Sequence, residues 1–256
     1  MASVPDLSVH YLPQFVAEHE LAGGAVVVID LLRASTTICH ALQSGAKDVM
    51  PFVEVDELFQ RAEGKDRSLV ILGGERGGER VEGFDLGNSP AEYTPDVVFG
   101  KHVLFTTTNG TRALHHAKLA ARVLVGSMAN LSRLVGSLKH DVAIHLLCAG
   151  TNGHVSREDI LVAGAIAYEL TTDDHPDRRL NDSAESARGE WQELLNTAKA
   201  YDRSADEQLA AELHDTPHGK TLIKLGFERD LTLCAQRDVA PVVPLYDARI
   251  GRITAV

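Results

Sequence analysis

Residues 26–37 read VVVIDLLRASTT, an apolar, β-branched run that ends in an aspartate and passes into a polar turn with an arginine. A similar run and polar turn return at residues 103–112, VLFTTTNGTR, and at residues 144–153, IHLLCAGTNG. A helix-like stretch follows each turn, and this alternation is typical of α/β proteins with buried strands. The three stretches therefore predict an α/β fold with mainly parallel sheets, whose ligands bind outside the carboxyl ends of the strands.

The rest of the chain continues the alternation of strands and helices. Apolar runs predict strands at residues 25–29, 49–53, 68–72, 103–107, 122–126 and 142–147. Helical spacing predicts helices at residues 36–43, 56–63, 111–119, 130–138 and 156–170. Nearer the C-terminus, His218 opens a further helix, residues 231–235 read as a strand or a short helical turn, and residues 242–246 read as an extended piece.

The length of 256 residues suits one large α/β unit or two closely joined lobes. We treat residues 1–256 as a single unit with approximate lobes at 20–100 and 101–170. Residues 173–215 form an acidic segment with apolar positions such as Trp191 and Leu194, which predict helices that cover or extend the core. Residues 216–256 complete the core.

The formal net charge of −11 argues against a protein that binds nucleic acid, because such proteins usually need a basic face. Residues 173–215 contain 12 acidic and 5 basic side chains, a net of −7, so most of the excess lies in one segment. An anion site elsewhere on the protein stays compatible with this charge.

The N-terminal residues MASVPD lack the basic and apolar regions of a signal peptide, and no later run reaches the length of a membrane span. We expect a cytoplasmic protein with no membrane partner. The three cysteines, Cys39, Cys148 and Cys234, are widely spaced and form no metal-binding motif, which argues against disulfides and structural zinc.

The polar turns supply donors for an oxyanion. Backbone amides at a helix N-terminus lack partners and lie at the positive end of the helix dipole, and the hydroxyl groups of the turns add further donors. One such turn would mean little, because Ser and Thr also cap structural helices. Three in one chain predict a small polyanionic ligand.

Five motifs together resemble the 2-phosphosulfolactate phosphatase (ComB) family in order and spacing. They are DLLRASTT at residues 30–37, GGER at 73–76, GFDLGNSP at 83–90, TTTNGT at 106–111, and CAGT at 148–151 with the acidic pair at 158–159. The resemblance runs from Asp30 to the 220s and more loosely through residues 229–238.

The resemblance implies a fold of two similar, closely associated α/β/α lobes. It also implies a magnesium-dependent phosphatase, a phosphoric monoester hydrolase that converts 2-phosphosulfolactate to sulfolactate and inorganic phosphate, a step of coenzyme M biosynthesis. The partner is then a small phosphorylated sulfonate, and a homodimer is left open as the assembly. Because the substrate also carries a carboxylate, one site would need several anion-binding turns.

Four carboxylates are candidates to bind Mg²⁺. Asp30 ends a buried strand, where an unpaired carboxylate is costly, although a helix cap or an ion pair with Arg33 would also explain it. Glu75 lies between two glycine pairs, in a turn that a ligand can approach closely. Glu158 and Asp159 lie in the first turn of a helix, where acids also favour the helix dipole for structural reasons.

Arginines and hydroxyl groups are the candidates to bind the anion, because guanidinium pairs with phosphate and sulfonate oxygens in bidentate fashion. Of Arg33, Arg76, Arg112 and Arg157, the first two are the preferred candidates. We assign catalysis to Asp30, Arg33, Glu75 and Arg76. We assign substrate binding to Ser35, Thr36, Asn88, Thr107, Thr108, Asn109, Gly110, Thr111, Gly150 and Thr151.

Two mechanisms stay open: activation of water by bound magnesium, which we favour, and attack by Asp30 to form an aspartyl-phosphate. Cys148 lacks the arginine spacing of a phosphatase nucleophile, so it is read as a packed residue. His154 is either a general acid or simply exposed.

Two other functions are compatible with the residues. The protein could hydrolyse a different small phosphorylated hydroxy acid, or it could bind an anion without turnover. Buried carboxylates beside the ligand distinguish these functions, because a pure anion binder gains nothing from Asp30 and Glu75.

Overall fold

The computed structural model describes residues 6–172 and 178–256. Its strands are β1 Leu7–His10, β2 Ala25–Ile29, β3 Asp48–Pro51, β4 Val70–Arg76, β5 Glu79–Arg80, β6 His102–Thr106, β7 Arg122–Gly126, β8 Ile144–Cys148, β9 Pro244–Asp247 and β10 Arg252–Ala255. Its α-helices are α1 Ala34–Gln43, α2 Val55–Ala62, α3 Pro95–Val98, α4 Gly110–His116, α5 Leu131–Leu138, α6 Arg157–Thr172, α7 Asp182–Ala200, α8 Ala205–Asp215, α9 Pro217–Lys224 and α10 Glu228–Ala235.

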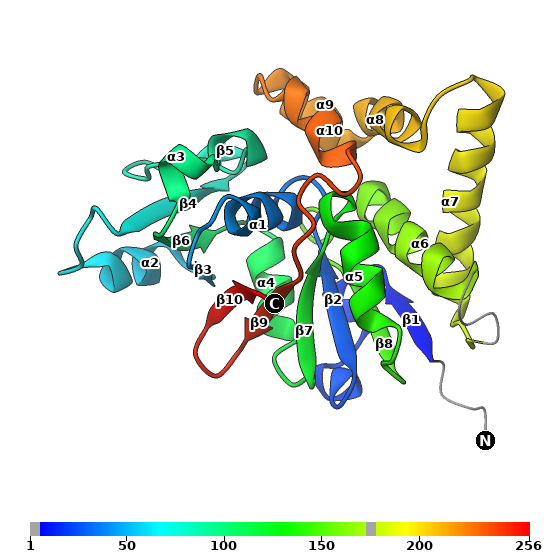
Figure 1. The fold of residues 1–256 in the computed structure, drawn as a ribbon, viewed down its shortest axis with the longest axis horizontal. Helices are drawn as coiled ribbons and strands as arrows, with labels where there is room; N and C mark the ends of the chain where they lie inside the picture. The colour runs from blue at the N-terminus through cyan, green and yellow to red at the C-terminus, as the bar shows by residue number, and fades with distance from the viewer. Residues whose placement is uncertain (1–5, 173–177) are drawn as a thin grey trace.

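The strands form one mixed sheet in the order β1-β8-β2-β7-β9-β10-β3-β6-β4-β5. A first set, β1, β8, β2 and β7, is parallel throughout, and a second set contains the parallel strands β3, β6 and β4. The hairpin of β9 and β10 lies between the two sets, as Figure 1 shows in red. The expected α/β fold with mainly parallel strands is confirmed.

The two sets of strands run in opposite directions along the sheet. β9 is antiparallel to β7 and to β10, and β10 is antiparallel to β3. The carboxyl ends of the two sets therefore lie at opposite edges of the sheet. A wholly parallel sheet, in which all carboxyl ends share one edge, is not what the chain forms. The turns after β2 and β6 still meet, because α4 follows β6 directly and packs against β2 and α1.

Neither set of strands comes from one continuous part of the sequence. β2, from the predicted lobe 20–100, pairs with β7 and β8, whereas β6, from the predicted lobe 101–170, lies between β3 and β4. The chain thus crosses repeatedly from one set to the other, and the predicted boundary at residue 100 separates neither set.

Helices cover both faces of the first set of strands. Successive side chains of β2 point to opposite faces, and each face packs against different helices. Val27 and Ile29 pack in a cluster with α5 and α6, whereas Val26 and Val28 pack in a cluster with α1 and α4. Such strands are buried on both faces, which explains the continuous apolar run of β2. α2 covers the second set, where its Leu58 packs in a cluster with residues of β3, β4 and β6.

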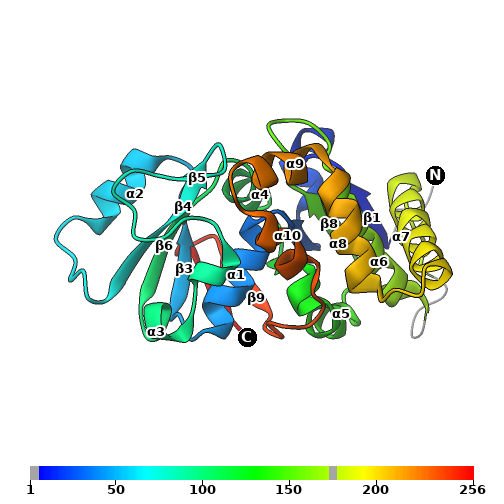
Figure 2. The ribbon, with the colours of Figure 1, turned by 90° about the horizontal axis from the view of Figure 1, so that it is seen from above.

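Most of the described part of the acidic segment is helical, in α7 and α8. α7 packs along α6, and buried Trp191 and Leu194 join the cluster of the first set. α8, α9 and α10 then run above the sheet in the view of Figure 1, where α8 contacts α7, and where α9 and α10 lie nearer the middle of the molecule (Figures 1 and 2). The segment does extend the core, while residues 173–177 lie outside the described part of the chain.

Most predicted elements occur, with ends shifted by a few residues. Residues 231–235 belong to helix α10, and the extended piece at 242–246 contributes to β9. The sequence reading missed β1, β5 and β10, which are four residues or fewer. None of the helices in the described ranges is long and apolar enough to cross a bilayer. The cytoplasmic location and the homodimer stay predictions.

Candidate active site

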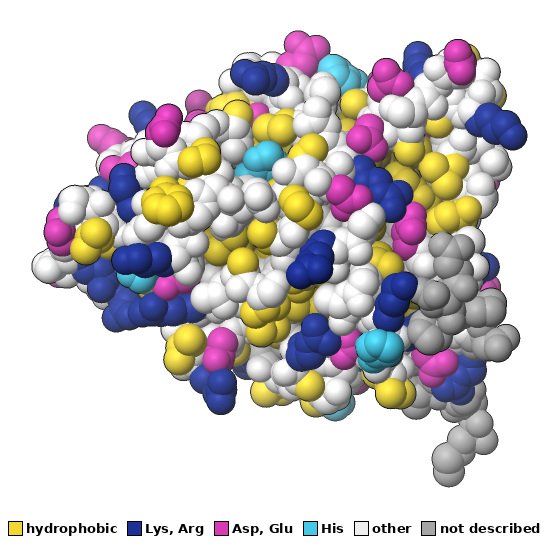
Figure 3. All heavy atoms as spheres, in the orientation of Figure 1, with side chains coloured by type: hydrophobic (Ala, Val, Ile, Leu, Met, Phe, Trp, Pro, Cys, Tyr) yellow, Lys and Arg dark blue, Asp and Glu magenta, His cyan; other side chains and the backbone are white. Residues whose placement is uncertain are grey.

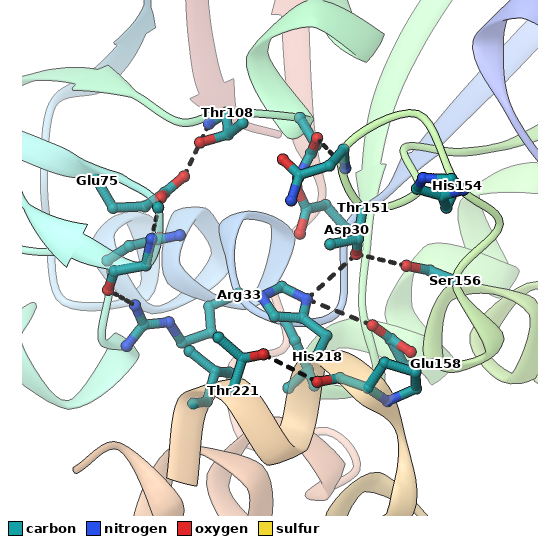
Figure 4. Close-up of a pocket in the computed structure, with 18 of the residues that line it drawn as sticks. Asp30, Arg33, Glu75, Thr108, Thr151, His154, Ser156, Glu158, His218 and Thr221 are labelled. Atoms are coloured by element: carbon teal, nitrogen blue, oxygen red, sulfur yellow. Dashed lines mark hydrogen bonds and ion pairs between the residues drawn. The ribbon is translucent and has the colours of Figure 1, made fainter. Parts of the chain in front are cut away.

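A cavity of about 480 Å³ lies where the turns after β2, β4, β6 and β8 meet helix α9 (Figure 4). Its lining comprises Asp30, Leu32, Arg33, Glu75, Gly77, Gly78, Asn88, Thr108, Asn109, Thr151, Asn152, His154, Val155, Ser156, Arg157, Glu158, Pro217, His218, Thr221 and Leu222. All three polar turns of the sequence analysis contribute to it. The cavity is therefore the place at which the predicted ligand turns converge.

Asp30 lies in the wall of this cavity, at the N-terminus of α1. The backbone N–H of Ala34 donates to its carboxylate, and the N-terminal glycine of α4, Gly110, packs so closely that a side chain there would meet the carboxylate. Burial raises the pKa of Asp30 to about 6; the charge of His218 opposes this shift and that of Glu75 adds to it. Asp30 is thus a buried acid whose charge is costly without a cationic partner.

Glu158 and His218 form a second ionisable group in the wall. His218 Nδ1 lies 3.4 Å from Glu158 Oε1 and 3.3 Å from the hydroxyl of Thr151, which in turn lies 2.6 Å from the hydroxyl of Ser156 (Figure 4). Glu158 is almost completely buried, at 2% exposure. The contact between α6 and α9 therefore places a carboxylate and an imidazole side by side at the cavity.

Glu75 connects two of the converging turns. Its Oε1 accepts a hydrogen bond from the N–H of Thr108 at 2.8 Å, and its Oε2 accepts one from the N–H of Gly78 at 2.7 Å. Arg76 points to the other side of β4, because successive side chains of a strand alternate, and donates to Val53 O and Thr106 Oγ1. Arg76 does not line the cavity, contrary to the site placement expected from the sequence.

Arg33 lines the cavity but is held on three sides. Its Nη1 pairs with Asp230 at 2.7 Å, its Nη2 donates to Gly78 O at 2.8 Å, and its guanidinium lies 4.2 Å from the ring centroid of Phe227. Only 2% of its surface is exposed. Asp230 also accepts a hydrogen bond from the hydroxyl of Ser89, so α10 fixes the position of this guanidinium.

Three buried polar atoms of the lining have no hydrogen-bond partner: Asn88 Oδ1, Thr108 Oγ1 and Glu158 Oε1. Across the described residues, only six buried side-chain atoms are in this state. Buried polar atoms are normally satisfied, so their concentration in one cavity indicates a ligand that would satisfy them.

Asp159 has a different environment from Glu158. Its Oδ1 accepts a hydrogen bond from the N–H of Leu31 and its Oδ2 accepts one from the N–H of Gly150, which ties the turn after β2 to the turn after β8. Burial raises the pKa of Asp159 well above its usual range, and the charge of Asp30 adds to this shift. Both carboxylate oxygens already serve the backbone, and neither Asp159 nor Gly150 lines the cavity.

Several predicted hydroxyl donors are also engaged within the protein. Ser35 Oγ accepts from the N–H of Asp30, Thr36 Oγ1 bonds Ser127 Oγ, and Thr111 Oγ1 donates to Thr107 O. Besides Gly150, the predicted binding residues that do not line the cavity are Ser35, Thr36, Thr107, Gly110 and Thr111. These side chains shape the turns, whereas Asn88, Thr108, Asn109 and Thr151 reach the cavity itself.

The remaining sequence candidates fall into two groups. His154 and Arg157 line the cavity, and both are exposed at its mouth. Arg112 is exposed and outside the lining, and Cys148 is completely buried, with a pKa raised by burial, as expected of a packed residue.

The lining can accommodate a hard cation. No group of three or more His, Cys, Asp or Glu side chains in residues 6–172 and 178–256 is arranged as a complete metal site. Magnesium, however, is usually bound by one or two carboxylates together with waters and substrate phosphates. Both oxygens of Glu75 and both oxygens of Asp159 accept amide hydrogen bonds. Asp30 receives one, from Ala34, and Glu158 Oε1 has only its 3.4 Å contact with His218, so Asp30 and Glu158 are the best fit.

Sequence reasoning missed three residues of the site: Ser156, His218 and Asp230. From the sequence, Ser156 and His218 are each only the first residue of a predicted helix. The sequence does signal a tight helix start at Thr216-Pro217, where the Thr216 side chain caps α9. Nothing local, however, shows that α9 and α10 fold back over turns that lie more than 60 residues earlier.

Several known proteins are similar to this chain over most of its length. A family model described as 2-phosphosulpholactate phosphatase matches residues 10–249. A protein of Symbiobacterium thermophilum named "Probable 2-phosphosulfolactate phosphatase" is 43% identical over 89% of this chain and 93% of its own length. Proteins of the same name from Thermotoga petrophila and Caldanaerobacter subterraneus subsp. tengcongensis are 39% and 37% identical, over 85% and 90% of this chain and 87% and 90% of their own lengths.

Proposed function

The chain belongs to the 2-phosphosulpholactate phosphatase family, and from this premise we propose that it is a magnesium-dependent phosphatase that hydrolyses 2-phosphosulfolactate to sulfolactate and inorganic phosphate. One observation carries the proposal. Three buried polar atoms without a hydrogen-bond partner, from Asn88, Thr108 and Glu158, line the same cavity as the buried carboxyl of Asp30. A phosphate oxygen would accept a hydrogen bond from the Thr108 hydroxyl, and a cation would be a partner for the oxygens of Asn88 and Glu158.

Asp30 and Glu158 are the residues that would hold Mg²⁺. When bound, the ion would neutralise charge on the phosphate oxygens. A cation would also favour the ionised form of Asp30, whose pKa of about 6 results chiefly from burial. The donor set, two carboxylates and no thiolate, suits a hard cation that prefers oxygen ligands.

The polar side chains of the cavity bind and orient the ester. The unpartnered hydroxyl of Thr108 can donate to a phosphate oxygen, and the amide of Asn88 faces the same space. Glu75 links the Thr108 turn to the Gly78 turn through its two hydrogen bonds, so the donors are positioned before the substrate arrives. We favour water as the attacking nucleophile, with attack by Asp30 as the alternative.

Release of inorganic phosphate from racemic 2-phosphosulfolactate tests the proposal. The wild type should release phosphate with Mg²⁺ and lose this activity with EDTA, and Asp30→Asn should lose it in both conditions. Asp96→Asn, at an exposed position in the first turn of α3, is the matched control and should keep wild-type activity. A folded wild type that releases no phosphate would refute this substrate and favour another phosphorylated hydroxy acid.

Calorimetric titration with Mg²⁺ separates binding from turnover. The wild type should bind the ion, and both Asp30→Asn and Glu158→Gln should bind it at least tenfold more weakly, because each removes a carboxylate from the donor set. Equal affinity in all three proteins would contradict the assignment of these two ligands.

A further inference from the structure

Two guanidinium groups line the cavity, and they differ in what they can offer a ligand. Arg33 is 2% exposed and its charge is already neutralised by Asp230, while Gly78 O and the Phe227 ring cover it on other sides. Arg157 is 53% exposed. Arg157 is therefore the arginine of the lining that can reach an anion entering from solvent.

Arg157 is held over the mouth of the cavity by the acidic helices. Its Nη2 lies 2.6 Å from Glu212 Oε2 on α8, and its Nε lies 3.6 Å from Glu190 Oε2 on α7. In the described residues, no ion pair or hydrogen bond involves its Nη1. Because a guanidinium carries five N–H groups in a fixed plane, Arg157 can keep both tethers and still donate from Nη1.

The depth of the cavity determines which part of the ester meets Arg157. The side chains assigned to the phosphate and its cation, Asp30, Asn88 and Glu158, are each less than a tenth exposed. Arg157 and its neighbour His154 lie at the exposed end. An ester with its phosphate at the buried end would therefore extend its most distant group toward Arg157.

We propose that Arg157 is a specificity-determining residue that binds the acid group farthest from the phosphate, and that Glu190 and Glu212 hold it in position. In 2-phosphosulfolactate this group is the sulfonate, which is one carbon farther from the phosphate-bearing carbon than the carboxylate. The inference rests on the proposed function and assigns a role to the acidic segment. Through these two glutamates, α7 and α8 hold the guanidinium of Arg157 toward the substrate.

Matched substrates test this role. We would measure kcat and KM for 2-phosphosulfolactate and for 2-phospholactate, which has the carboxylate but no sulfonate, with wild type, Arg157→Gln and Arg157→Lys. Arg157→Gln should reduce kcat/KM for the sulfonate ester roughly tenfold more than for 2-phospholactate, mainly through KM, since the contact does not involve the reacting atoms. Arg157→Lys should recover part of the loss, because it keeps the charge but not the planar fork.

A double variant and a control distinguish binding by Arg157 from a purely structural role. Glu212 Oε2 is buried and has no hydrogen-bond partner beyond the ion pair with Arg157, so removing the arginine leaves a carboxylate uncompensated. The double variant Arg157→Gln/Glu212→Gln removes this charge and should keep the same substrate preference as the single variant. Arg112→Gln, an exposed arginine outside the lining, should leave the ratio between the two substrates unchanged.

The outcomes separate this inference from the proposed function. If the wild type hydrolyses both esters and Arg157→Gln lowers kcat/KM for both by the same factor, Arg157 does not read the sulfonate and the inference is wrong. A wild type that hydrolyses neither ester overturns the proposed function and the inference with it. In the wild type, added salt should raise KM for the sulfonate ester more than in Arg157→Gln, because the pairing is half exposed and screened.

Discussion

Lowering the pH from about 8 to about 5 should destabilise the fold by about 2 kcal/mol through His10 alone. His10 ends β1, and its Nε2 lies 3.1 Å from Nδ1 of His145 on β8, with the two rings stacked at a centroid distance of 5.4 Å. Burial, with a smaller contribution from the charge of His145, lowers the pKa of His10 to about 4. The native pair is therefore neutral at pH 7.

The magnitude follows from the difference between the folded and unfolded pKa values of His10, about 4 and 6.5. Below pH 6.5 the unfolded chain binds the proton and the folded chain does not, so stability is complete above pH 6.5 and falls as the pH decreases. At about 1.4 kcal/mol per pKa unit, the loss reaches about 2 kcal/mol at pH 5 and levels off near 3 kcal/mol below pH 4. Burial also lowers the pKa of His145, which acts in the same direction.

Urea unfolding at pH 8 and pH 5 measures this effect. Asp30 opposes it, because its raised pKa makes the folded state bind protons more readily, so the comparison must be with a variant. His10→Phe keeps a ring against His145 and removes the titrating group, and its loss of stability between the two pH values should be about 2 kcal/mol smaller than that of the wild type. His19→Gln, at an exposed position, should behave as the wild type. Equal pH dependence in His10→Phe and the wild type would refute the reasoning.

Two further predictions concern packing and charge. Gly164→Ala should destabilise the protein by about 1–3 kcal/mol in urea unfolding, because a Cβ at this position of α6 would clash with Ala187 O on α7 and force the helices apart. Asp230→Ala should cost about 3–5 kcal/mol, measured in the same way, because it leaves the guanidinium of Arg33 buried without its counter-charge.

Each of these predictions has a control in the chain. Gly136→Ala, in α5, meets no atom within 4 Å and should be neutral or stabilise the helix by up to about 1 kcal/mol. Asp215→Ala removes a carboxylate that is 89% exposed and should change stability by less than about 0.5 kcal/mol. A loss in Gly136→Ala as large as in Gly164→Ala, or in Asp215→Ala as large as in Asp230→Ala, would contradict the corresponding explanation.

The sequence predicts those parts of the fold that depend on local pattern. β2 and β8 are apolar runs that end in polar turns, and α6 follows one of these turns, so their types and approximate ends can be inferred from neighbouring residues. The strand order is different, because it depends on pairing between distant segments. β1 and β10 are too short to show periodicity. They are strands because β1 pairs with β8, and β10 pairs with β9 and β3.

The candidate site divides in the same way. The motifs place Asp30, Glu75, Thr108 and Glu158 in one cavity, where the structure finds them. Sequence alone cannot distinguish Glu158 from its neighbour Asp159, because both lie in the first turn of α6, and only the fold shows which carboxylate faces the backbone. The alternation of β4 does separate Glu75 from Arg76, but only once the register of that strand is known.

The hairpin of β9 and β10, which lies between the two sets of strands, has a consequence for how the protein is made. Translation proceeds from the N-terminus, so every strand of both sets leaves the ribosome before this hairpin does. Until then the two sets have no β9–β10 hairpin between them, and their edge strands β7 and β3 can pair with other chains. The nascent chain should therefore be most prone to aggregation just before β9 and β10 emerge, and ribosome-bound chains that stop short of β9 should depend most on chaperones.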